Sequence, residues 1–396
     1  PELVETGHEV HALVLKKEVP PQWSGVTLHA YHPSKGTAPG VHPWALDLET
    51  KIIRAESVFR KCLELREQGF SPDVILAHPG WGESLFVKDV WPHTKLGIYC
   101  EFFYQSAGAD VGFDPEFSSS TDEDACRLRL KNANYQLHFP IAQAGLSPTH
   151  WQRSGFPSPF REQIQVVHDG IDTARVSPRA EVSLQLKTNN GLRQLTRADE
   201  LITFVNRNLE PYRGYHVFMR SLPEILRRRP NARVLIVGAD DVSYGARPEH
   251  GQKWKDIFAA EVRPQISDED WRRVHFLGNV AYQHFIPLLQ LSTVHVYLTY
   301  PFVLSWSLLE AMSAGCAIVA SDTQPLHEAI KDGETGKLVN FFDHARLTQE
   351  VCDLLDKPQE RQRLGANARA FAQQNYDLQT VCLPRQLAWV NDLIGS

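Results

Sequence analysis

Cysteine is scarce in this sequence of 396 residues, and its six copies form neither a CxxC pair nor a dense cluster. The sequence therefore signals neither a zinc site nor a disulfide framework. Long hydrophobic runs are lacking as well. The most apolar stretch, residues 286–312, is interrupted by Gln290, His295 and Glu310 and cannot span a bilayer. No earlier segment has the pattern of a signal peptide, so we expect a cytoplasmic protein. Peripheral contact with the inner face of the membrane stays open as an alternative.

An excess of positive charge is missing too. The formal net charge is −6, and the calculated isoelectric point is about 6.3. Such a chain does not generate the positive field that sequence-independent nucleic-acid binding needs, so nucleic acid is not expected as the main partner. Hydrophobic residues make up 42% of the chain, which excludes disorder. Because single cores stop growing near ~250–300 residues, we expect two or three domains.

The dinucleotide fingerprint GxGxxG is absent from both halves, so NAD-type oxidoreduction lacks its main sequence support. What is present is an alternation of short apolar runs with longer amphipathic ones, which predicts an α/β fold with two Rossmann-like domains and parallel sheets. The predicted strands are residues 10–15, 26–29, 73–77, 96–100, 165–167, 201–205, 233–237, 274–277, 294–298 and 317–320. The predicted helices are residues 51–67, 282–291 and 307–314, a helix around residues 218–226, and helices over the last ~40 residues.

A polar stretch, residues 168–199, separates the two series, and we place the hinge near residues 168–172. We assign residues 1–167 to an N-terminal domain, 168–375 to a C-terminal domain, and 376–396 to a helix that packs back on the N-terminal domain. Residues 105–122 have no periodicity and are predicted to be a loop. The chain opens in what resembles a helix, so we expect a strand and a glycine-bearing loop upstream of Pro1. The sheet of the first domain should then lack its central strand.

Two segments of the second half carry candidate chemistry. In FVNRNLEPYRGYH, Arg207 and Arg213 flank a loop closed by Gly214, and both guanidinium groups could converge on an anion near a helix N-terminus. The alternative is two solvated surface arginines. In TYPFVLSWSLLEAMSAG, Ser307 and Glu310 have the spacing of a capping box. A carboxylate one turn into such a helix can also accept two ribose hydroxyls, and both interpretations place Glu310 at the mouth of a cleft.

These segments occur in an order that resembles the family 4 retaining glycosyltransferases of the GT-B fold. The resemblance covers residues 201–339, through NRNLEPYRG, VLIVG, FLG, LLEAMSAG and HEAI with DGETG. GHEVHAL, DVILAHPGWGE and HDGID are looser counterparts in the first half. The resemblance implies that a nucleoside-diphosphate sugar binds the second domain and the acceptor binds the first. It implies no metal ion and no other cofactor, and a leaving diphosphate that helps to deprotonate the acceptor.

Carried over by position, the resemblance implies that Arg207 contacts the donor diphosphate and that Arg213 replaces the usual lysine. Glu310 would hold the ribose, and His78 and Glu101 would lie where this family often has histidines. The candidate catalytic residues are therefore Arg207, Arg213, His78 and Glu101, and the candidate nucleotide-sugar-binding residues are Arg207, Arg213, Gly238, Ser305, Trp306, Ser307 and Glu310.

One position departs from the family. The first glutamate of its E-x7-E motif is Phe302 here, and an aromatic ring cannot accept hydrogen bonds from sugar hydroxyls as a carboxylate does. We therefore predict a donor pocket that depends less on a carboxylate, with backbone amides of residues 305–307 contributing contacts.

Together these features predict a metal-independent glycosyltransferase that moves a hexose from a nucleoside-diphosphate sugar, with retention. The expected acceptor is a glycan, a lipid-linked molecule or a small molecule, in cell-surface polysaccharide or glycoconjugate synthesis. One alternative is a sugar-nucleotide epimerase of the same fold, with His78 and Glu101 as its acid and base. The other is a non-catalytic nucleotide-sugar-binding protein, which Phe302 suggests.

Overall fold

The computed structural model describes residues 1–117, 122–188 and 191–395. The chain divides into two compact units: unit 1 comprises residues 1–106, 120–168 and 383–396, and unit 2 comprises residues 107–119 and 169–382. The break after residue 168 falls within the predicted hinge. The predicted division differs at residues 107–119, which join unit 2 although their place in the sequence lies among residues of unit 1. It also differs at residues 376–382, which were assigned to the terminal helix but belong to unit 2. Residues 118–121 of the predicted loop lie outside the described residues.

Unit 2 is built on a six-stranded parallel sheet with the order β12-β11-β10-β13-β14-β15. The strand that comes first in the sequence, β10, is central, and the strand order reverses on either side of it. The four inner strands β11, β10, β13 and β14 are buried over most of their length, as expected for a parallel sheet covered on both faces, whereas the edge strands β12 and β15 are largely half-buried. Their bounds are β10 (Leu201–Asn208), β11 (Arg233–Ala239), β12 (Val274–Gly278), β13 (Val294–Tyr297), β14 (Ile318–Ser321) and β15 (Lys337–Val339).

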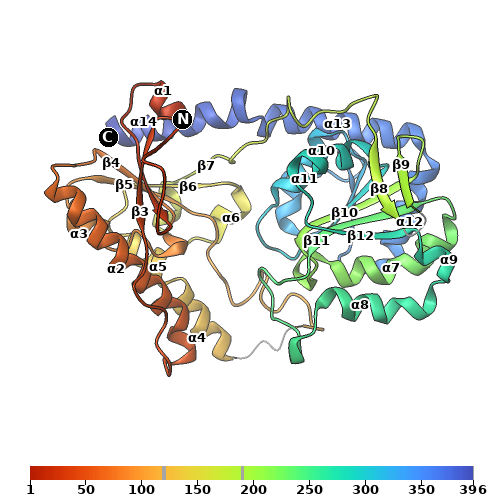
Figure 1. Ribbon diagram of the computed structural model, residues 1–396, viewed down its shortest axis with the longest axis horizontal. Coiled ribbons are helices and arrows are strands. Elements are labelled where there is room, and N and C mark those ends of the chain that lie inside the picture. The colour runs from red at the N-terminus through yellow and green to blue at the C-terminus, as the bar shows by residue number, and fades with distance from the viewer. Residues whose placement is uncertain (118–121, 189–190, 396) are drawn as a thin grey trace. The chain divides into compact units, whose positions relative to one another are not determined.

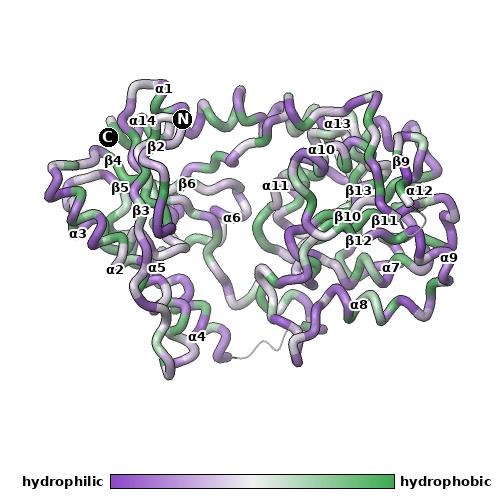
Figure 2. Tube along the Cα trace, in the orientation of Figure 1, coloured by the Kyte–Doolittle hydropathy of each residue, from purple (hydrophilic) through white to green (hydrophobic). Residues whose placement is uncertain are grey.

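Helices cover both faces of this sheet (Figure 1). One hydrophobic cluster joins the sheet to α7 (Tyr215–Arg228), α8 (Trp254–Val262) and α12 (His344–Asp356). A second cluster joins the opposite face to α10 (Tyr282–Leu291), α11 (Trp306–Ser313) and α13 (Pro358–Tyr376). Figure 2 shows the apolar residues concentrated in the strands between these helices. The predicted helix around residues 218–226 is part of α7, which continues through Pro223.

A β-hairpin occupies part of the stretch that the sequence suggested was only a polar linker. Strands β8 (Leu184–Thr188) and β9 (Gly191–Leu195) pair in antiparallel register and contribute Leu186 and Leu195 to the second hydrophobic cluster. Only one face of the hairpin is buried, so polar residues interrupt the apolar ones along both strands. Neither strand therefore stands out in the sequence as an apolar run. Asn189 and Asn190, part of the TNNG letters, lie outside the described residues.

His295 is fully buried in β13 and gives unit 2 a pH-dependent stability. Its Nδ1 atom lies 2.8 Å from Thr203 Oγ1, and burial lowers its pKa to about 4. Since the unfolded chain binds a proton below its ordinary pKa of about 6.5, stability is lost as the pH falls from that value towards 4. We expect unfolding to become easier by about 2 kcal/mol between pH 7.5 and pH 5 from this group alone.

The measurement is urea denaturation of the wild type and of His295→Gln at both pH values. The glutamine can still form a hydrogen bond to Thr203 but does not titrate, so the variant should lose about 2 kcal/mol less than the wild type over this range. Equal losses in the two proteins would show that His295 does not control this pH dependence.

Unit 1 contains two separate sheets. Strands β4 (Val74–Ala77), β5 (Lys95–Tyr99), β6 (Ala144–Ser147) and β7 (Ile164–Val166) are parallel and lie in sequence order. The other sheet has the order β1-β3-β2, in which β1 (His11–Leu15) and β3 (Val26–Tyr31) are parallel and β2 (Gln22–Trp23) is antiparallel to β3. The sequence-based expectation included every one of these strands except β2 and β6.

The two sheets of unit 1 do not join at strands β1 and β4. Within the described residues these strands do not pair, and residues of both line a cavity of about 600 Å³. Leu13, Leu15 and Leu76, on the same two strands, remain 37%, 42% and 45% exposed.

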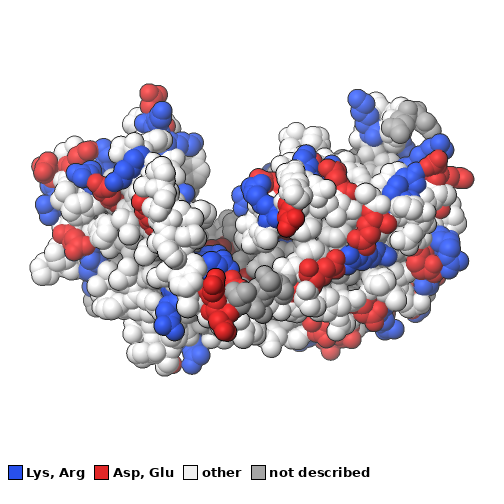
Figure 3. Space-filling model, turned by 90° about the horizontal axis from the view of Figure 1, so that it is seen from below, with Lys and Arg blue, Asp and Glu red and all other residues white. Residues whose placement is uncertain are grey.

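The helices of unit 1 are α1 (Glu2–Glu5), α2 (Leu46–Glu67), α3 (Val87–Val90), α4 (Asp122–Lys131), α5 (Ala133–His138), α6 (His150–Ser154) and α14 (Leu383–Gly395). Helix α14 packs on β5, where Gly97 lets the Trp389 ring approach: a Cβ on this glycine would lie 2.6 Å from the ring. In the described part of the chain, no helix is both long and apolar enough to cross a membrane. Acidic and basic side chains are interspersed on the face shown in Figure 3.

Candidate functional site

The predicted donor residues gather at one edge of the sheet of unit 2. Parallel strands end at a common carboxyl edge, which is where α/β proteins bind ligands. Arg207 lies near the end of β10, Gly238 near the end of β11, and Ser305 begins α11 beyond β13. The sequence-predicted residues of this half therefore share one edge, although they come from segments about 100 residues apart.

Arg213 is buried and supports a neighbouring loop. Its Nη1 atom donates to Thr299 Oγ1 at 2.8 Å, to the Val303 carbonyl at 3.3 Å and to Tyr297 Oη at 3.4 Å. Only 7% of the residue is exposed. Gly214 adopts a left-handed conformation with φ of 65°, and a Cβ there would lie 2.3 Å from Leu298. The turn therefore packs tightly against the chain that leaves β13.

Arg207 differs from Arg213 in its exposure to solvent. Its side chain is exposed, and within the described residues its guanidinium group has no hydrogen-bond or ion-pair partner. Gly238 lies close by along the sheet edge, where a Cβ would be 2.7 Å from Leu209 and 3.1 Å from the Asn206 carbonyl oxygen. The structure gives the two arginines no shared partner, so their convergence on one anion stays a prediction.

Glu310 is not part of a capping box, contrary to the sequence-based interpretation. The N-cap of α11 is Ser305, whose Oγ atom accepts a hydrogen bond from the Ser307 backbone amide at 3.3 Å. The Glu310 carboxylate instead accepts a hydrogen bond from Tyr282 Oη at 2.6 Å. Burial raises the pKa of Glu310, while the Tyr282 hydrogen bond and nearby Arg175 act in the opposite direction. The helix begins two residues earlier than the motif suggests because Ser305 supplies the cap.

The start of α11 offers fewer free amides than we predicted. The Ser305 amide donates to Tyr297 Oη at 3.2 Å, and the Ser307 amide is used by the cap. Trp306 is 57% exposed, and its indole Nε1 donates to Asp169 at 3.0 Å. A nucleotide contact through the Ser305 or Ser307 amide would therefore require a rearrangement of these hydrogen bonds.

Phe302 is covered by aromatic residues. Its ring lies 4.8 Å from that of Tyr244 and 5.7 Å from that of Tyr212, and the Arg213 guanidinium carbon lies 5.3 Å from the Tyr244 ring. The loop that carries Tyr244 is fixed by Glu210, a carboxylate only 1% exposed that accepts the amides of residues 243–245 at 3.1–3.2 Å. The family's carboxylate position is thus replaced here by an aromatic cover over Arg213.

In unit 1 the structure brings His78 and Glu101 together. His78 follows β4 and Glu101 follows β5, and His78 Nε2 lies 3.1 Å from Glu101 Oε2. The Glu101 amide donates to Tyr135 Oη at 3.2 Å, and its carbonyl accepts from Gln152 at 2.6 Å. The Glu101 side chain is 48% exposed, whereas His78 Nδ1 is buried without a partner among the described residues. Glu101 is therefore the more accessible member of the pair, with its side chain 48% exposed against 26% for His78.

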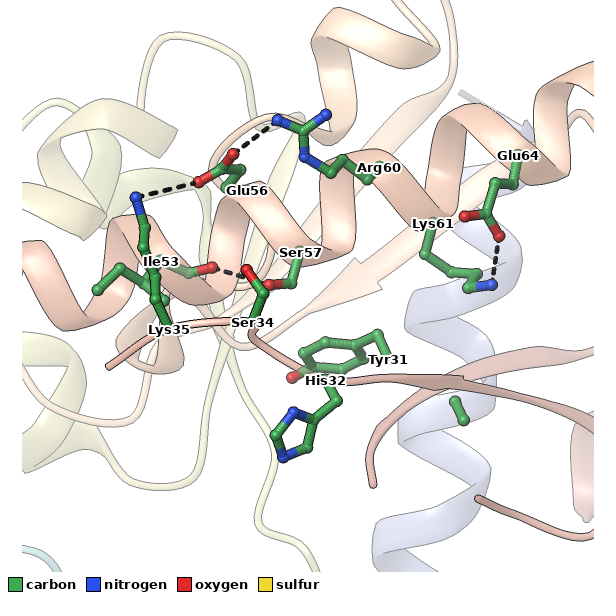
Figure 4. A pocket seen from close by; sticks show the side chains of 11 residues that line it. Tyr31, His32, Ser34, Lys35, Ile53, Glu56, Ser57, Arg60, Lys61 and Glu64 are labelled. Atoms are coloured by element: carbon green, nitrogen blue, oxygen red, sulfur yellow. Dashed lines mark hydrogen bonds and ion pairs between the residues drawn. The ribbon is translucent and has the colours of Figure 1, made fainter. Parts of the chain in front are cut away.

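A second cavity of unit 1, of about 310 Å³, lies between α2 and the end of β3 (Figure 4). It contains Lys35, Arg60 and Lys61, which would attract an anion. Each cation already lies beside a carboxylate, however: Lys35 and Arg60 beside Glu56, and Lys61 beside Glu64. We assign this cavity no function.

Within the described residues, one group of side chains has metal-ligand spacing. Ligand atoms of Asp114, Glu116 and His216 lie within 4.8 Å of one another. Both oxygens of Glu116 are bound by Arg220 at 2.7 Å, and Asp114 is bound by His216 and Tyr300. Internal ion pairs thus account for this cluster, and the absence of a metal from the reaction stays a prediction.

Sequence reasoning missed Tyr282, Tyr244, Glu210 and Asp114. None of them belongs to a spacing pattern, because their partners come from distant segments. One signal was visible for Asp114: the segment GFDPEF, within the predicted loop, has two phenylalanines and two acidic residues, which is unusual for a solvated turn.

Comparison with known families matches both halves of the chain. Residues 6–176 match the glycosyl transferase family 4 group, and residues 192–371 match the glycosyl transferases group 1. Together these stretches cover most of the sequence.

Curated relatives that match include proteins named as glycosyltransferases. Over 216 residues the chain is 29% identical to the D-inositol 3-phosphate glycosyltransferase of Streptomyces scabiei, covering 54% of this chain and 45% of that protein. Over 243 residues it is 25% identical to spore coat protein SA of Bacillus subtilis, covering 58% of each. Over 239 residues it is 27% identical to the GDP-mannose-dependent alpha-(1-6)-phosphatidylinositol monomannoside mannosyltransferase of Mycolicibacterium smegmatis, covering 59% and 58%. The chain thus spans about half the length of the curated relatives it matches.

Solved structures share the fold. Sucrose-phosphate synthase from Thermosynechococcus elongatus matches with a TM-score of 0.72 at 18% identity, covering 100% of this chain and 91% of that one. Anabaena HepE, in complex with UDP and glucose, matches with a TM-score of 0.62 at 16% identity, covering 93% and 86%. The predicted α/β fold of GT-B type, with two Rossmann-like domains, is confirmed.

Proposed function

Since the chain belongs to the glycosyltransferases of the family 4 group, we propose that it transfers a sugar from a nucleoside-diphosphate sugar to an acceptor hydroxyl, with retention at the anomeric carbon. One observation carries this proposal. Arg207, Gly238, Arg213 and the first turns of α11 with Glu310 occupy one carboxyl edge of the unit 2 sheet. That edge supplies a cation for a diphosphate and a carboxylate for a ribose.

In this proposal the donor residues have distinct roles. Arg207, exposed and without a protein partner in the described structure, binds the diphosphate directly through charge-assisted hydrogen bonds. Arg213 supports the loop around Thr299 and Val303 and adds positive charge behind the phosphates. Glu310, oriented by Tyr282, accepts ribose hydroxyls. Positive charge placed before the reaction stabilises the negative charge that develops on the departing diphosphate.

The acceptor binds unit 1, where the Glu101 carboxylate accepts a hydrogen bond from the acceptor hydroxyl. The contact with His78 holds this carboxylate in place. In the transfer, the bond from the anomeric carbon to the diphosphate oxygen breaks, and a bond to the acceptor oxygen forms. The acceptor proton passes to the leaving diphosphate. The acceptor itself, whether glycan, lipid-linked or small molecule, is selected by contacts around this pair.

Binding of the donor tests the proposal without any knowledge of the acceptor. We expect one of UDP-, GDP-, ADP- or dTDP-sugars to raise the melting temperature, because a ligand at 100 times its dissociation constant stabilises by about 2.7 kcal/mol. The UDP and GDP arms are motivated by the UDP-bound HepE structure and the GDP-mannose-dependent relative. If none of the four donors causes a shift at millimolar concentration, the proposed function is wrong.

Glu310→Gln gives the matched variant for this screen. The amide still accepts a hydrogen bond from Tyr282 but lacks the charge that strengthens a ribose hydrogen bond, so we expect native stability and about 10-fold weaker nucleotide binding. Isothermal titration with the nucleotide identified in the screen measures this difference. Wild-type affinity in the Glu310→Gln variant would show that Glu310 does not bind the ribose.

Product analysis separates the remaining alternatives. The proposal requires a glycosylated acceptor when donor is incubated with a panel that includes inositol phosphates, a phosphatidylinositol and free sugars. Isomerised sugar formed from donor alone would indicate an epimerase instead. Donor binding without transfer or hydrolysis across the panel would indicate a binding protein.

A further inference from the structure

Residues 107–117, which we call the strap, come from the first half of the sequence but pack within unit 2. Two phenylalanines anchor the strap. Phe113 lies 5.1–5.3 Å from the rings of Tyr300, Phe341 and Phe342, and Phe117 lies 5.0–6.0 Å from those of His216, Trp254 and Phe258. Both pack on the hydrophobic cluster that includes α7 and α8. The strap is therefore an integral part of unit 2.

The strap also places two aspartates in this unit. Asp114 is 3% exposed; its Oδ2 atom accepts a hydrogen bond from Tyr300 Oη at 2.8 Å and lies 3.1 Å from His216 Nε2. Asp110, also 3% exposed, accepts a hydrogen bond from Tyr212 Oη at 2.7 Å. Burial alone would raise the pKa of Asp114, but the bonds from His216 and Tyr300 bring it below its ordinary value. The Asp114 carboxylate is thus buried, and His216 and Tyr300 stabilise its charged form.

The two tyrosines belong to the loops of the donor site. Tyr212 immediately precedes Arg213, and Tyr300 immediately follows Thr299, which accepts a hydrogen bond from Arg213. The Tyr300 amide donates to the Tyr212 carbonyl at 3.0 Å, and the Phe302 amide donates to the Tyr300 carbonyl at 2.7 Å. The rings of Tyr212 and Tyr300 lie 4.6 Å apart. A displacement of Tyr300 would therefore shift both Arg213 and Phe302.

We propose that Asp114 is a positioning residue of the nucleotide-sugar site, which acts through the Tyr300 hydroxyl to fix the loop of residues 299–303 around Arg213. The inference rests on the proposed function, because it concerns the same donor site. It adds to that site a residue that lies almost 100 positions earlier in the sequence. Asp114 itself touches no substrate.

The test compares Tyr300→Phe and Asp114→Asn with Glu116→Gln. Tyr300→Phe removes a single hydroxyl and keeps the aromatic packing, so it remains informative if the buried Asp114 variant folds poorly. Glu116→Gln is the matched control, because Glu116 lies on the same strap but pairs with Arg220 on α7 and not with a loop of the site. The measurements are the melting temperature without ligand and the dissociation constants of UDP and GDP by isothermal titration at 15 °C.

We expect Tyr300→Phe and Asp114→Asn each to weaken binding of the preferred nucleotide by about 10-fold, the size of one lost hydrogen bond to a charged group. Glu116→Gln should change the melting temperature but leave the dissociation constant within about twofold, since exposed ion pairs act locally. The double variant of Asp114 and Tyr300 should bind as Tyr300→Phe does, because the aspartate acts through that hydroxyl.

Unchanged nucleotide binding in Tyr300→Phe and Asp114→Asn, with lower melting temperatures, would overturn the inference and leave the strap a purely structural element. An additive loss in the double variant would also overturn it. A wild-type protein that binds neither UDP nor GDP in the titration, nor any donor in the thermal screen, would instead overturn the proposed function on which the inference rests.

Discussion

Glu101→Ala should lower kcat for sugar transfer about 100-fold while leaving the dissociation constant of the donor unchanged. Correct placement of a reacting hydroxyl by a polar group contributes a factor of this size. Glu101 lies on unit 1, is half-exposed, and is oriented by His78 and by two hydrogen bonds to its backbone. Donor binding, assigned to unit 2, does not involve this residue. Steady-state kinetics with saturating acceptor, together with nucleotide titration, would measure both quantities.

His78 acts through Glu101, so His78→Ala should lower kcat by a smaller factor, about 10-fold. His93, an exposed histidine of the same unit, offers a matched control whose alanine variant should retain full activity. A Glu101→Ala enzyme with wild-type turnover would eliminate the pair from catalysis. A loss of donor binding in the same variant would place Glu101 in the donor site instead.

Arg213→Ala should destabilise the protein strongly, whereas Arg207→Ala should leave its stability almost unchanged. Removing the Arg213 guanidinium group leaves the Thr299 hydroxyl and the Val303 carbonyl without their donor in a buried site, which should cost about 3 kcal/mol of unfolding free energy. Arg207 is exposed, and its loss should change stability by less than about 0.5 kcal/mol. Urea denaturation of both variants measures this contrast.

Both variants should also bind nucleotide more weakly. We expect about a 10-fold loss for Arg207→Ala, which removes a direct phosphate contact, and about a 100-fold loss for Arg213→Ala, which also disorganises its loop. Arg272 is an exposed arginine of unit 2 away from the sheet edge, and its alanine variant is the control for nonspecific loss of charge. Nucleotide affinity that survives in the double variant of Arg207 and Arg213 would contradict the assignment of the diphosphate to these residues.

Much of the fold could be predicted from local sequence. The strands of unit 2 are continuous apolar runs because both faces of its sheet are covered, so β10, β11, β12, β13 and β14 were predicted to within a few residues. Strand β6 was missed. It has only four residues and no apolar pattern of its own. Gly145 within it is buried because Ile164 and Phe160 pack against it. The hairpin of β8 and β9 was missed because its exposed face is polar.

The candidate site could be predicted in part. Arg207 and Arg213 were identified as a basic pair in a loop before a helix, and Glu310 as a carboxylate one turn into a helix at the sheet edge. Gly238 was implied only by the family resemblance. His78 and Glu101 came only from the family resemblance, and the structure adds their 3.1 Å contact. The difference between an exposed Arg207 and a buried Arg213 was not visible. It depends on Thr299, Val303 and Tyr244, which approach Arg213 only in the folded chain.

The sequence alone determined the alternation of strands and helices, the parallel sheets and the family, because these depend on periodicity and on motifs read along the chain. Tertiary structure decided which serine caps α11, why Phe302 is covered, and that residues 107–117 belong to unit 2. Each of these depends on partners from distant segments of the sequence or on competition between neighbouring caps. The hydrogen bond between Asp114 and Tyr300 spans 186 residues, and the packing of Phe113 and Phe117 on unit 2 helps to bring its two ends together.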